Sequence, residues 1–513
     1  MMFFSTFGLM FIRLKVNKSG KTSVQILEKR NRKNILLHTV GCTDDKQLLE
    51  KFQNQAHNWI KSKVGKGELD FEGIESMYDS FLKHIVHIQP IGVKLVLEKI
   101  YSDIGFDAIN DSLFKQLVIG RVNYPVSKLK LTEYLARYES QHVSEDHIYR
   151  HLDKLDKRFK HQVQQISYQH SVKVLGEVPK FVFYDVTTLY FEAEREDNLR
   201  ISGFSKDGKH QHPQIVLGLL VSKKGYPLGY EIFRGDKYEG HTLLPVLNHF
   251  RRIYGLKNIV VVADSGLLTQ DNINALKSNG YQFILGARIK TEKESLKNQI
   301  LSLQLGNNEY KELKKQEDRL IIGYSDARAK KDAINRQKGI IRLEKEIKSG
   351  KLKKDSITNR GYKKFLELKD EVRVEINHIK IQEDQKWDGL KGYLTNSELP
   401  LQDIVDAYKE LWIIEKAFKI NKNDIKIRPI YHRLPKRIEA HICICFTAYK
   451  LIKELERKLE ELELSVSANR LLEIADSVHQ IEVYVPTIKA TKKSIIYKTD
   501  EHDLVKKFLS HNT

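Results

Sequence analysis

The chain has 513 residues, which at the usual domain size corresponds to about three structural units. Hydrophobic residues make up 41%, which is enough for a folded core and too little for a polytopic membrane protein. Lys and Arg number 87 against 67 Asp and Glu, and this excess of +20 is spread along the whole chain. Such a charge indicates a polyanionic partner, nucleic acid before a membrane surface.

Cysteine content and the start of the chain bear on the compartment. Three cysteines, Cys42, Cys443 and Cys445, are too few for a disulfide framework and favour a reducing cytoplasm. Residues 1–12 are apolar, but they lack the positive region of a signal peptide and fall short of the ~20 residues of a membrane span. The sequence therefore predicts a cytoplasmic protein with no membrane partner.

The first 170 residues predict a β-hairpin followed by helices. Residues 11–16 and 22–27 flank a turn at 17–20, which is a hairpin pattern. Helical periodicity extends over three ranges, 46–63, 72–100 and 110–160. Within the last range, Leu131–Tyr138 and Ser144–Phe159 flank a short polar connection, which predicts either a DNA-binding helix-turn-helix or two ordinary packed helices.

From residue 178 the pattern changes to that of an α/β domain. Five short apolar runs predict buried strands: Phe181–Thr188, Gln214–Val221, Pro227–Phe233, Asn258–Ala263 and Tyr281–Gly286. Helices are predicted at His241–Tyr254 and Thr269–Asn279, the second with Thr269 as its N-cap and Gly280 just beyond its end. Three strands in a meander, followed by helix, strand, helix and strand, are the order of a ribonuclease-H-like domain.

A basic stretch interrupts this domain between residues 291 and 385. Arg328–Lys364 holds 14 Lys and Arg against 4 Asp and Glu, with helical periodicity. Arg319–Gly323 and Glu371–Ile376 predict strands, so the insertion is expected to be an α+β subdomain. The positive charge of Arg328–Lys364 is explained about equally well by a solvated helix face and by a surface that contacts DNA.

After the insertion the α/β domain resumes with a strand at Trp387–Leu394 and one long helix at Leu401–Lys422. The predicted fold class is α/β: a ribonuclease-H-like mixed sheet with an inserted α+β subdomain, preceded by a mainly helical N-terminal region with a β-hairpin. The expected segments are 1–170 for the hairpin and a helical DNA-binding region, 178–290 and 386–455 for the two parts of the α/β domain, 291–385 for the basic insertion, and 456–513 for a helical C-terminal region.

Two aspartates are candidate metal ligands. Asp185 lies inside an apolar run, where a carboxylate costs several kcal/mol unless it is paired, hydrogen-bonded or bound to a cation. Asp264 closes the apolar run 260–263, although Asp264 to Gly266 is also ordinary turn chemistry. Both fall on adjacent central strands of the proposed sheet, where two carboxylates repel unless a divalent cation lies between them. Hard oxygen ligands in an open site suit Mg²⁺ or Mn²⁺.

A third acid lies on the long predicted helix. Tyr408, Glu415 and Lys422 are spaced by seven and seven residues, so a continuous helix presents all three on nearly one face. Such a face is either a surface ladder or part of a site. The two aspartates favour the second interpretation.

At this point the sequence resembles the DDE transposases of bacterial insertion sequences, in the branch whose third acid lies in a Tyr-Arg-Glu-Lys signature. The matching segments are Tyr184–Glu192, Gly203–Lys209, Pro213–Leu219, Val262–Gly266, Trp387–Gly389, Leu394–Asn396, Tyr408–Lys422 and Arg428–His432, followed by His441. The resemblance extends from about residue 10 to 455. One position departs from it: Leu411 stands where the signature has Arg, so that charge is missing or is supplied elsewhere, by Arg428 or Arg433.

The resemblance implies that Asp185, Asp264 and Glu415 are the catalytic triad and the ligands of two Mg²⁺ or Mn²⁺ ions. It implies DNA contacts by four residues of the shared motifs, Tyr408, Lys422, Arg428 and His432. The expected partner is double-stranded DNA, both the terminal inverted repeats of the element and the target. A homodimer is expected in the DNA complex, in the bacterial cytoplasm at the nucleoid.

The function expected from the resemblance is cleavage of DNA at the ends of an insertion sequence and transfer of those ends to target DNA. Two alternatives are a ribonuclease-H-like nuclease or resolvase that cuts without strand transfer, and a DNA-binding protein that has lost catalysis. The matching motifs outside the triad argue against the first alternative, and an intact triad argues against the second.

Overall fold

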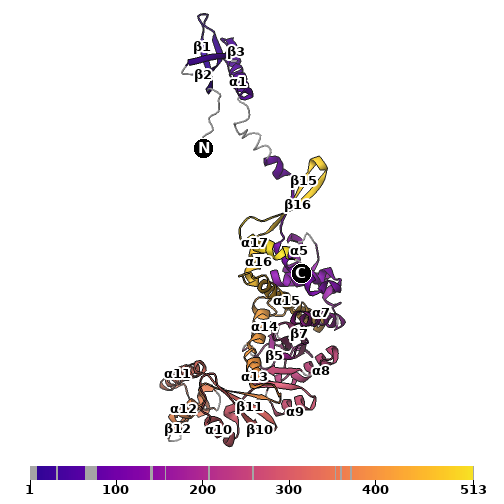
Figure 1. Ribbon diagram of the computed structural model, residues 1–513, viewed down its shortest axis with the longest axis vertical. Coiled ribbons are helices and arrows are strands. Elements are labelled where there is room, and N and C mark those ends of the chain that lie inside the picture. Colours follow the sequence, from indigo (N-terminus) through magenta and orange to yellow (C-terminus); the bar gives the residue numbers. More distant parts are fainter. Residues whose placement is uncertain are drawn as a thin grey trace. The chain divides into compact units, whose positions relative to one another are not determined.

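The computed structural model describes residues 9–30, 33–63, 78–138, 142–155, 157–193, 195–205, 208, 210–256, 259–267, 269–352, 354–358, 361–369 and 373–511. The chain divides into two compact units (Figure 1). The first comprises residues 1–88 and 481–494, and the second comprises residues 89–480 and 495–513. The predicted boundary at residue 170 is therefore not where the chain divides.

The first unit contains a three-stranded antiparallel sheet of β1 (Leu9–Val16), β2 (Thr22–Arg30) and β3 (Lys33–Thr43), with helix α1 (Lys46–Lys63) packed on it. The predicted hairpin and the predicted helix 46–63 are confirmed, and β3 is an additional strand. Val24 and Ile26 of the central strand form a small core with Ala56 of the helix.

A second antiparallel sheet joins distant parts of the chain. Its strands are β4 (Ile85–Pro90), β15 (His479–Val485) and β16 (Ala490–Ile496), paired in the order β16-β15-β4. The prediction of a helix over 72–100 is wrong at β4, and its residues 72–77 lie outside the described part of the chain. The prediction of a helical C-terminal region is wrong at β15 and β16. Backbone pairing between segments so far apart overrides the local helical pattern.

An eight-stranded mixed sheet forms the centre of the second unit. In pairing order its strands are β10 (Tyr310–Lys315), β11 (Asp318–Tyr324), β14 (Leu390–Thr395), β9 (Gln282–Ala287), β8 (Val260–Ala263), β5 (Phe181–Tyr190), β6 (Gln214–Ser222) and β7 (Pro227–Arg234). β8 pairs in parallel with β5 and with β9, and the other neighbouring pairs are antiparallel. The meander β5-β6-β7 followed by β8 and β9 confirms the predicted ribonuclease-H-like order.

Helices cover both faces of this sheet. On one face, α8 (Leu243–Tyr254), α9 (Gln270–Ser278) and α10 (Glu294–Leu301) share a core with Val182 of β5 and Val261 of β8. On the other face, α13 (Leu401–Lys409) and α14 (Trp412–Asn423) pack with Phe183 and Val262 of the same strands. Thr269 is the N-cap of α9, as predicted, and its hydroxyl accepts a hydrogen bond from the backbone N–H of Asn272.

The basic insertion is smaller than the sequence suggests. Strands β10 and β11 lie within the predicted range 291–385, but β11 pairs with β14 and β10 pairs with β11, so both extend the main sheet. The remainder consists of α11 (Asp326–Lys348), β12 (Leu366–Lys369), β13 (Arg373–Ile376) and α12 (His378–Gln385). These elements enclose a separate core that includes Leu343, Phe365 and Val374. A strand is assigned to the main sheet by its pairing partner, which its own sequence does not reveal.

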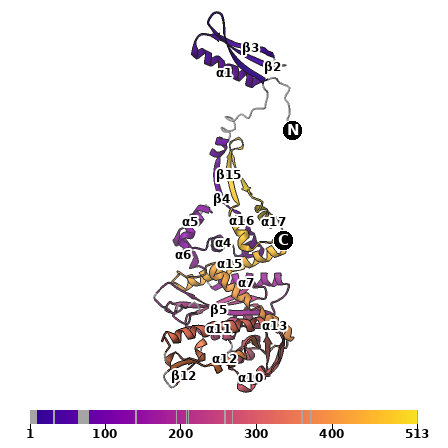
Figure 2. The same cartoon turned by 90° about the vertical axis from the view of Figure 1, so that its left-hand side faces the viewer.

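The remaining helices of the second unit gather around one long helix, α15 (Pro435–Glu461). They are α3 (Gly92–Ile104), α4 (Ser112–Asn123), α5 (Lys128–Tyr138), α6 (Glu145–Leu152), α7 (Lys157–Leu175), α16 (Ala468–Asp476) and α17 (His502–Ser510). Helix α15 contacts α3, α4, α6, α7, α16 and β7, and Figure 2 shows it between α4 and α7. Helices α5 and α6 contact each other, but their connection at 139–141 lies outside the described residues, so the helix-turn-helix stays a prediction.

Candidate active site

Asp185 and Asp264 lie just beyond the paired part of two neighbouring strands. β5 and β8 run parallel, and their pairing ends with Phe183 opposite Val262. Each aspartate stands two residues beyond this pair, so the same register, continued past the pairing, would bring the two to the same level of strands about 4.8 Å apart. Side chains two residues apart on a strand share a face, so both carboxylates project on the side covered by α13 and α14.

The backbone around each aspartate explains its position. β8 ends at Ala263, and the chain turns through Ser265–Leu267, where the N–H of Gly266 donates a hydrogen bond of 2.7 Å to Asp264 Oδ1. The N–H of Val186 donates a 2.7 Å hydrogen bond to Asp185 Oδ1. Asp264 is exposed and Asp185 is half-buried, so the pair is open on one side.

Glu415 does not lie on one continuous helix with Tyr408, as the sequence predicts. Helix α13 ends at Lys409, and α14 begins at Trp412. Across the break, Ile414 N–H bonds to the carbonyl of Leu411 three residues back, the tight hydrogen-bond pattern of a 3₁₀ turn. The heptad spacing therefore does not place Tyr408 on one face with Glu415 and Lys422, because the register is reset between the two helices.

Tyr408 is near both Asp264 and Glu415. It is 7% exposed, and its hydroxyl contacts Gly286 of β9, where a side chain would collide with it. Burial raises the pKa of this phenol above its usual value, and the charges of Asp264 and Glu415 raise it further. Asp264 and Glu415 therefore act on the same phenol.

Two cations in this region were not predicted from the sequence. The ammonium of Lys391, on β14, lies 4.6 Å from the ring centre of Tyr408 and 5.5 Å from that of Tyr393. Burial lowers the pKa of Lys391, the charge of Arg328 lowers it further, and Glu415 opposes both effects. The sequence feature that could have indicated Lys391 is its position inside the predicted strand Trp387–Leu394, where a charged residue is unusual. Arg328, on α11, could not be distinguished from the other cations of the basic stretch.

Leu411 explains why the signature arginine is absent at this position. It is 9% exposed and packs in the main core between α13 and α14. A charged side chain there would be buried at a cost of several kcal/mol. Lys391 and Arg328 supply positive charge beside Glu415 from other elements.

The carboxylates of Asp185, Asp264 and Glu415 are ligand types that a divalent cation prefers, but the three do not form a ready-made binding site. Within the described part of the chain, no three His, Cys, Asp or Glu side chains lie close enough together to hold a metal ion. Asp185 and Asp264 follow the last pair of β5 and β8 by two residues each, and Asp264 is exposed. Two carboxylates at the same level of neighbouring strands would need a compensating cation. That Glu415 joins them as a ligand stays a prediction.

The other predicted DNA contacts lie in different places. Lys422 is half-buried in the last turn of α14. The guanidinium of Arg428 lies 5.8 Å from the ring centre of Tyr190, at the end of β5. His432 is 9% exposed and lies against Tyr149. Arg428 and His432 line a cavity of about 550 Å³. Arg433, the other candidate for the missing signature charge, is exposed.

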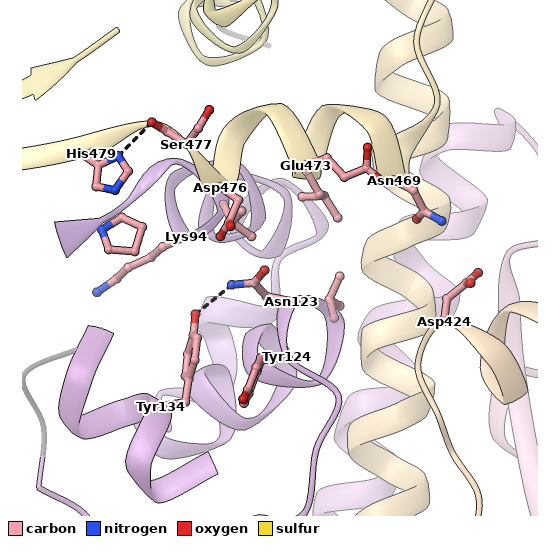
Figure 3. A pocket seen from close by; sticks show the side chains of 14 residues that line it. Lys94, Asn123, Tyr124, Tyr134, Asp424, Asn469, Glu473, Asp476, Ser477 and His479 are labelled. Atoms are coloured by element: carbon pink, nitrogen blue, oxygen red, sulfur yellow. Dashed lines mark hydrogen bonds between the residues drawn. The ribbon is translucent and has the colours of Figure 1, made fainter. Parts of the chain in front are cut away.

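A second cavity, of about 820 Å³, has the opposite charge. Three carboxylates line it, those of Asp424, Glu473 and Asp476, together with a stacked pair of tyrosines, Tyr124 and Tyr134 (Figure 3). A phosphate backbone would be repelled by these acids. We therefore assign no DNA contact to this cavity.

The described residues include no helix that is long and apolar enough to cross a membrane. No curated protein matches the chain. Two solved structures resemble it weakly. A piggyBac transposase synaptic complex with hairpin DNA has a TM-score of 0.39 and 8% identity, over 75% of this chain and 76% of that one. The Mos1 transposase paired-end complex with the left transposon end has a TM-score of 0.16 and 12% identity, over 45% and 71%.

The sequence comparison is more informative than these weak structural similarities. The family described as Transposase DDE domain matches residues 177–451, which is more than half of the chain. The match begins before β5 and ends within α15, so it contains the main sheet, the insertion and all three predicted acids. The chain belongs to the DDE transposase family.

Proposed function

We propose that this transposase cleaves DNA at the ends of its own insertion sequence and joins those ends to target DNA. The observation that supports the proposal is the parallel register of β5 and β8, which, continued by two residues, would bring Asp185 and Asp264 to the same level of the sheet. Glu415, on α14 above the same face, is the third acid. Two adjacent carboxylates repel each other unless a cation lies between them, so this arrangement favours a metal-dependent enzyme over a binding protein or a structural protein.

Asp185 and Asp264 would hold divalent cations, with Glu415 as the further ligand. Two bound Mg²⁺ or Mn²⁺ ions supply activation of the attacking oxygen and stabilisation of the leaving oxygen. In the first step water attacks a phosphorus, and the bond to the 3′ oxygen breaks to leave a 3′-hydroxyl. In the second step that hydroxyl attacks a phosphodiester of the target strand and displaces its 3′ oxygen. The chain's own residues position the reacting strand.

Positive charge beside the acids would hold the strand. Lys422 follows Glu415 by two helical turns, about 10.5 Å at 1.5 Å per residue, and would bind a neighbouring phosphate as a point charge. Lys391 and Arg328 would stand in for the signature arginine near the reacting phosphate. Because Tyr408 is buried and lies against Lys391, we propose that it positions Lys391 and Glu415 and does not itself contact DNA.

The DNA partners would be the terminal inverted repeats of the element and the target duplex, bound by a homodimer. The basic insertion would add contacts along the duplex. Lys351 and Lys338 are exposed cations of this stretch. Neutralising one lysine that binds a phosphate should flatten the plot of log binding constant against log salt by about 0.9.

The test is cleavage of DNA that carries the chain's own element ends. Asp185→Asn, Asp264→Asn and Glu415→Gln should each abolish cleavage while binding of the same DNA stays measurable, because each change removes an anionic ligand and keeps the size of the side chain. Asp406→Asn, on α13 and paired with Lys409, is the matched control and should cleave normally. Normal cleavage by the Glu415 variant would refute the assignment of the third acid.

Two further measurements separate the parts of the proposal. Calorimetric titration with Mn²⁺ without DNA should give binding to the wild-type protein and a loss of binding in the Asp264→Asn variant. Supplying a pre-cut end with a free 3′-hydroxyl should give a joined product with target DNA. Cleavage of element ends without any joined product would favour the nuclease or resolvase.

A further inference from the structure

The cavity beside Arg428 and His432 is built around cations. It has a volume of about 550 Å³ and lies between the α4–α5 connection, α6, and the segment that precedes α15. Five cationic side chains line it: Arg121, Lys128, Lys130, Lys426 and Arg428. Glu145, at the start of α6, is its one carboxylate among the described lining residues. We call this cavity the cationic pocket.

Two of these cations are largely buried side chains that line the pocket. Arg121 is 6% exposed and Lys128 is 5% exposed. Within the part of the chain that the structure describes, neither side chain pairs with a carboxylate, and neither is among the side chains whose polar atoms are fully enclosed without a hydrogen-bond partner. Their charged ends therefore meet the space of the pocket, which is where a counter-charge would lie.

The charges of the pocket also repel one another. Burial lowers the pKa of Lys128 well below its usual value, and the nearby charge of Arg121 lowers it further. Burial and the charges of Lys128 and Arg121 lower the pKa of His432 to about 3. His441, on α15, has a buried Nδ1 with no hydrogen-bond partner among the described residues. The walls therefore offer several donors and five positive charges against the single carboxylate of Glu145 among the described lining residues.

We propose that the cationic pocket binds a phosphate group of the DNA strand, held by Arg121 and Lys128 from the pocket walls. A phosphate is a compact dianion or monoanion with several acceptor oxygens, which matches a forked guanidinium and an ammonium on neighbouring helices. The aromatic ring of Tyr431, 67% exposed at the pocket, leaves room for the attached nucleoside. This proposal rests on the proposed function, because it assigns the phosphate to DNA.

The position of the pocket fixes which phosphate is meant. Arg428 lines the pocket and lies against Tyr190, five residues beyond Asp185 on the same strand. At about 3.3 Å per residue, that contact is about 17 Å from the proposed active site. On a duplex that follows β5 with a rise of about 3.4 Å per base pair, the bound phosphate would lie about five nucleotides from the cleaved bond.

The first experiment asks whether the pocket binds phosphate at all. Melting temperatures are measured in inorganic phosphate and in chloride at equal ionic strength, for the wild-type protein and the Lys128→Met and Lys128→Gln variants. Phosphate should raise the melting temperature of the wild-type protein and leave that of both variants unchanged, because a ligand that binds only the folded state stabilises it. A wild-type protein indifferent to phosphate would overturn the proposal, as would variants that keep the wild-type shift.

Two other lysines provide matched controls. Lys450 is fully buried but donates hydrogen bonds to Ser167 and Ser171. Lys436 is an exposed lysine of α15 that pairs with Asp153. Lys450→Met and Lys436→Met should both keep the phosphate shift, even where the first of them melts at a lower temperature. Loss of the shift in either control would show that its loss in the Lys128 variants is not specific to the cationic pocket.

The second experiment asks whether the phosphate belongs to DNA. Binding of element-end DNA is measured against salt in an Asp185→Asn background, which excludes cleavage. Lys128→Met should flatten the slope by about 0.9 on a duplex or about 0.7 on a single strand. An uncharged methylphosphonate about five nucleotides from the cut should weaken binding by the wild-type pocket and have no effect in the Lys128→Met variant.

The outcomes distinguish this proposal from the proposed function. A phosphate shift that depends on Lys128, with an unchanged salt slope, would identify a site for a free phosphate and overturn the assignment to DNA. Cleavage that survives in the Asp185, Asp264 and Glu415 variants would refute the catalytic proposal and leave the phosphate result standing.

Discussion

Helix α15 borders two clusters of buried charge that differ in composition. Toward its C-terminal end it contributes Lys450, Glu454 and Arg457 to an ion cluster with His170 and Tyr226, which lie on α7 and just before β7. Its first turns contribute His441 to the cationic pocket, where Arg121 and Lys128 have no anionic partner among the described residues. The same helix therefore borders a cluster that is internally paired and one that is not.

In the ion cluster each charge has a partner. Glu454 is fully buried, and its carboxylate accepts hydrogen bonds from the hydroxyl of Tyr226 at 3.0 Å and from Arg457 at 2.7 Å. Burial alone would raise the pKa of Glu454, but His170 and Arg457 lower it to about 2. A buried charge in this protein therefore does not by itself indicate a binding site. We take a buried charge to indicate a binding site when it borders an open cavity and lacks a counter-charge.

The largest expected effect is the loss of the acid in the ion cluster. Glu454→Ala removes the acceptor shared by Arg457, His170 and Tyr226, so the buried Tyr226 hydroxyl loses its acceptor and, among the described residues, Arg457 keeps only Glu461. We expect a loss of about 3–5 kcal/mol in the free energy of unfolding, measured by urea denaturation. Glu383→Ala, which breaks an exposed pair with Lys386, should change it by less than about 1 kcal/mol. Equal effects of the two changes would mean that the buried cluster is not a paired unit.

The second prediction concerns pH. The pKa of His432 falls from 6.5 to about 3 on folding, so the unfolded chain binds more protons between these values. Stability therefore rises with pH across this window and is lost as the pH falls, by at most about 1.4 kcal/mol per pH unit from this group. The groups that act on His432 are Lys128 on α5, Arg121 on α4 and Arg437 on α15, with the ring of Tyr149 on α6 against it.

Urea midpoints at a series of pH values test this prediction. The His432→Asn variant should show a shallower dependence on pH than the wild-type protein between about 6.5 and 3. Inorganic phosphate should reduce the wild-type dependence, because a bound anion favours the protonated imidazole. An identical pH dependence in the variant and the wild-type protein would contradict the assigned shift.

The smallest expected effects are changes of opposite sign in the free energy of unfolding when a lysine is replaced in the ion cluster and in the cationic pocket. Lys450→Met leaves the Ser167 carbonyl and the Ser171 hydroxyl buried without a donor, so it should destabilise the protein by about 1–3 kcal/mol. Lys128→Met removes a buried unpaired cation and should stabilise the protein by about 1 kcal/mol in phosphate-free buffer. Thermal and urea unfolding of both variants measures the signs. Destabilisation by both would show that Lys128 is satisfied in the folded chain.

Local sequence patterns were sufficient to predict the order of the central sheet and the place of the two aspartates. β6 is buried at every position. Asp185 interrupts the apolar sequence of β5, and Asp264 directly follows the apolar strand β8. These are local patterns of burial, and burial follows directly from side-chain polarity. The motifs of the matching family lie on these same segments.

Features that depend on a distant partner could not be predicted in this way. The pairing of β11 with β14 and the pairing of β4 with β15 join segments that are far apart in the chain. Lys391 lies beside Glu415, and Arg121 and Lys128 lie beside His432, because packing brings separate helices and strands together. Polarity along a chain predicts which residues are buried, whereas the neighbours of a buried charge, and hence its chemistry, depend on the folded arrangement.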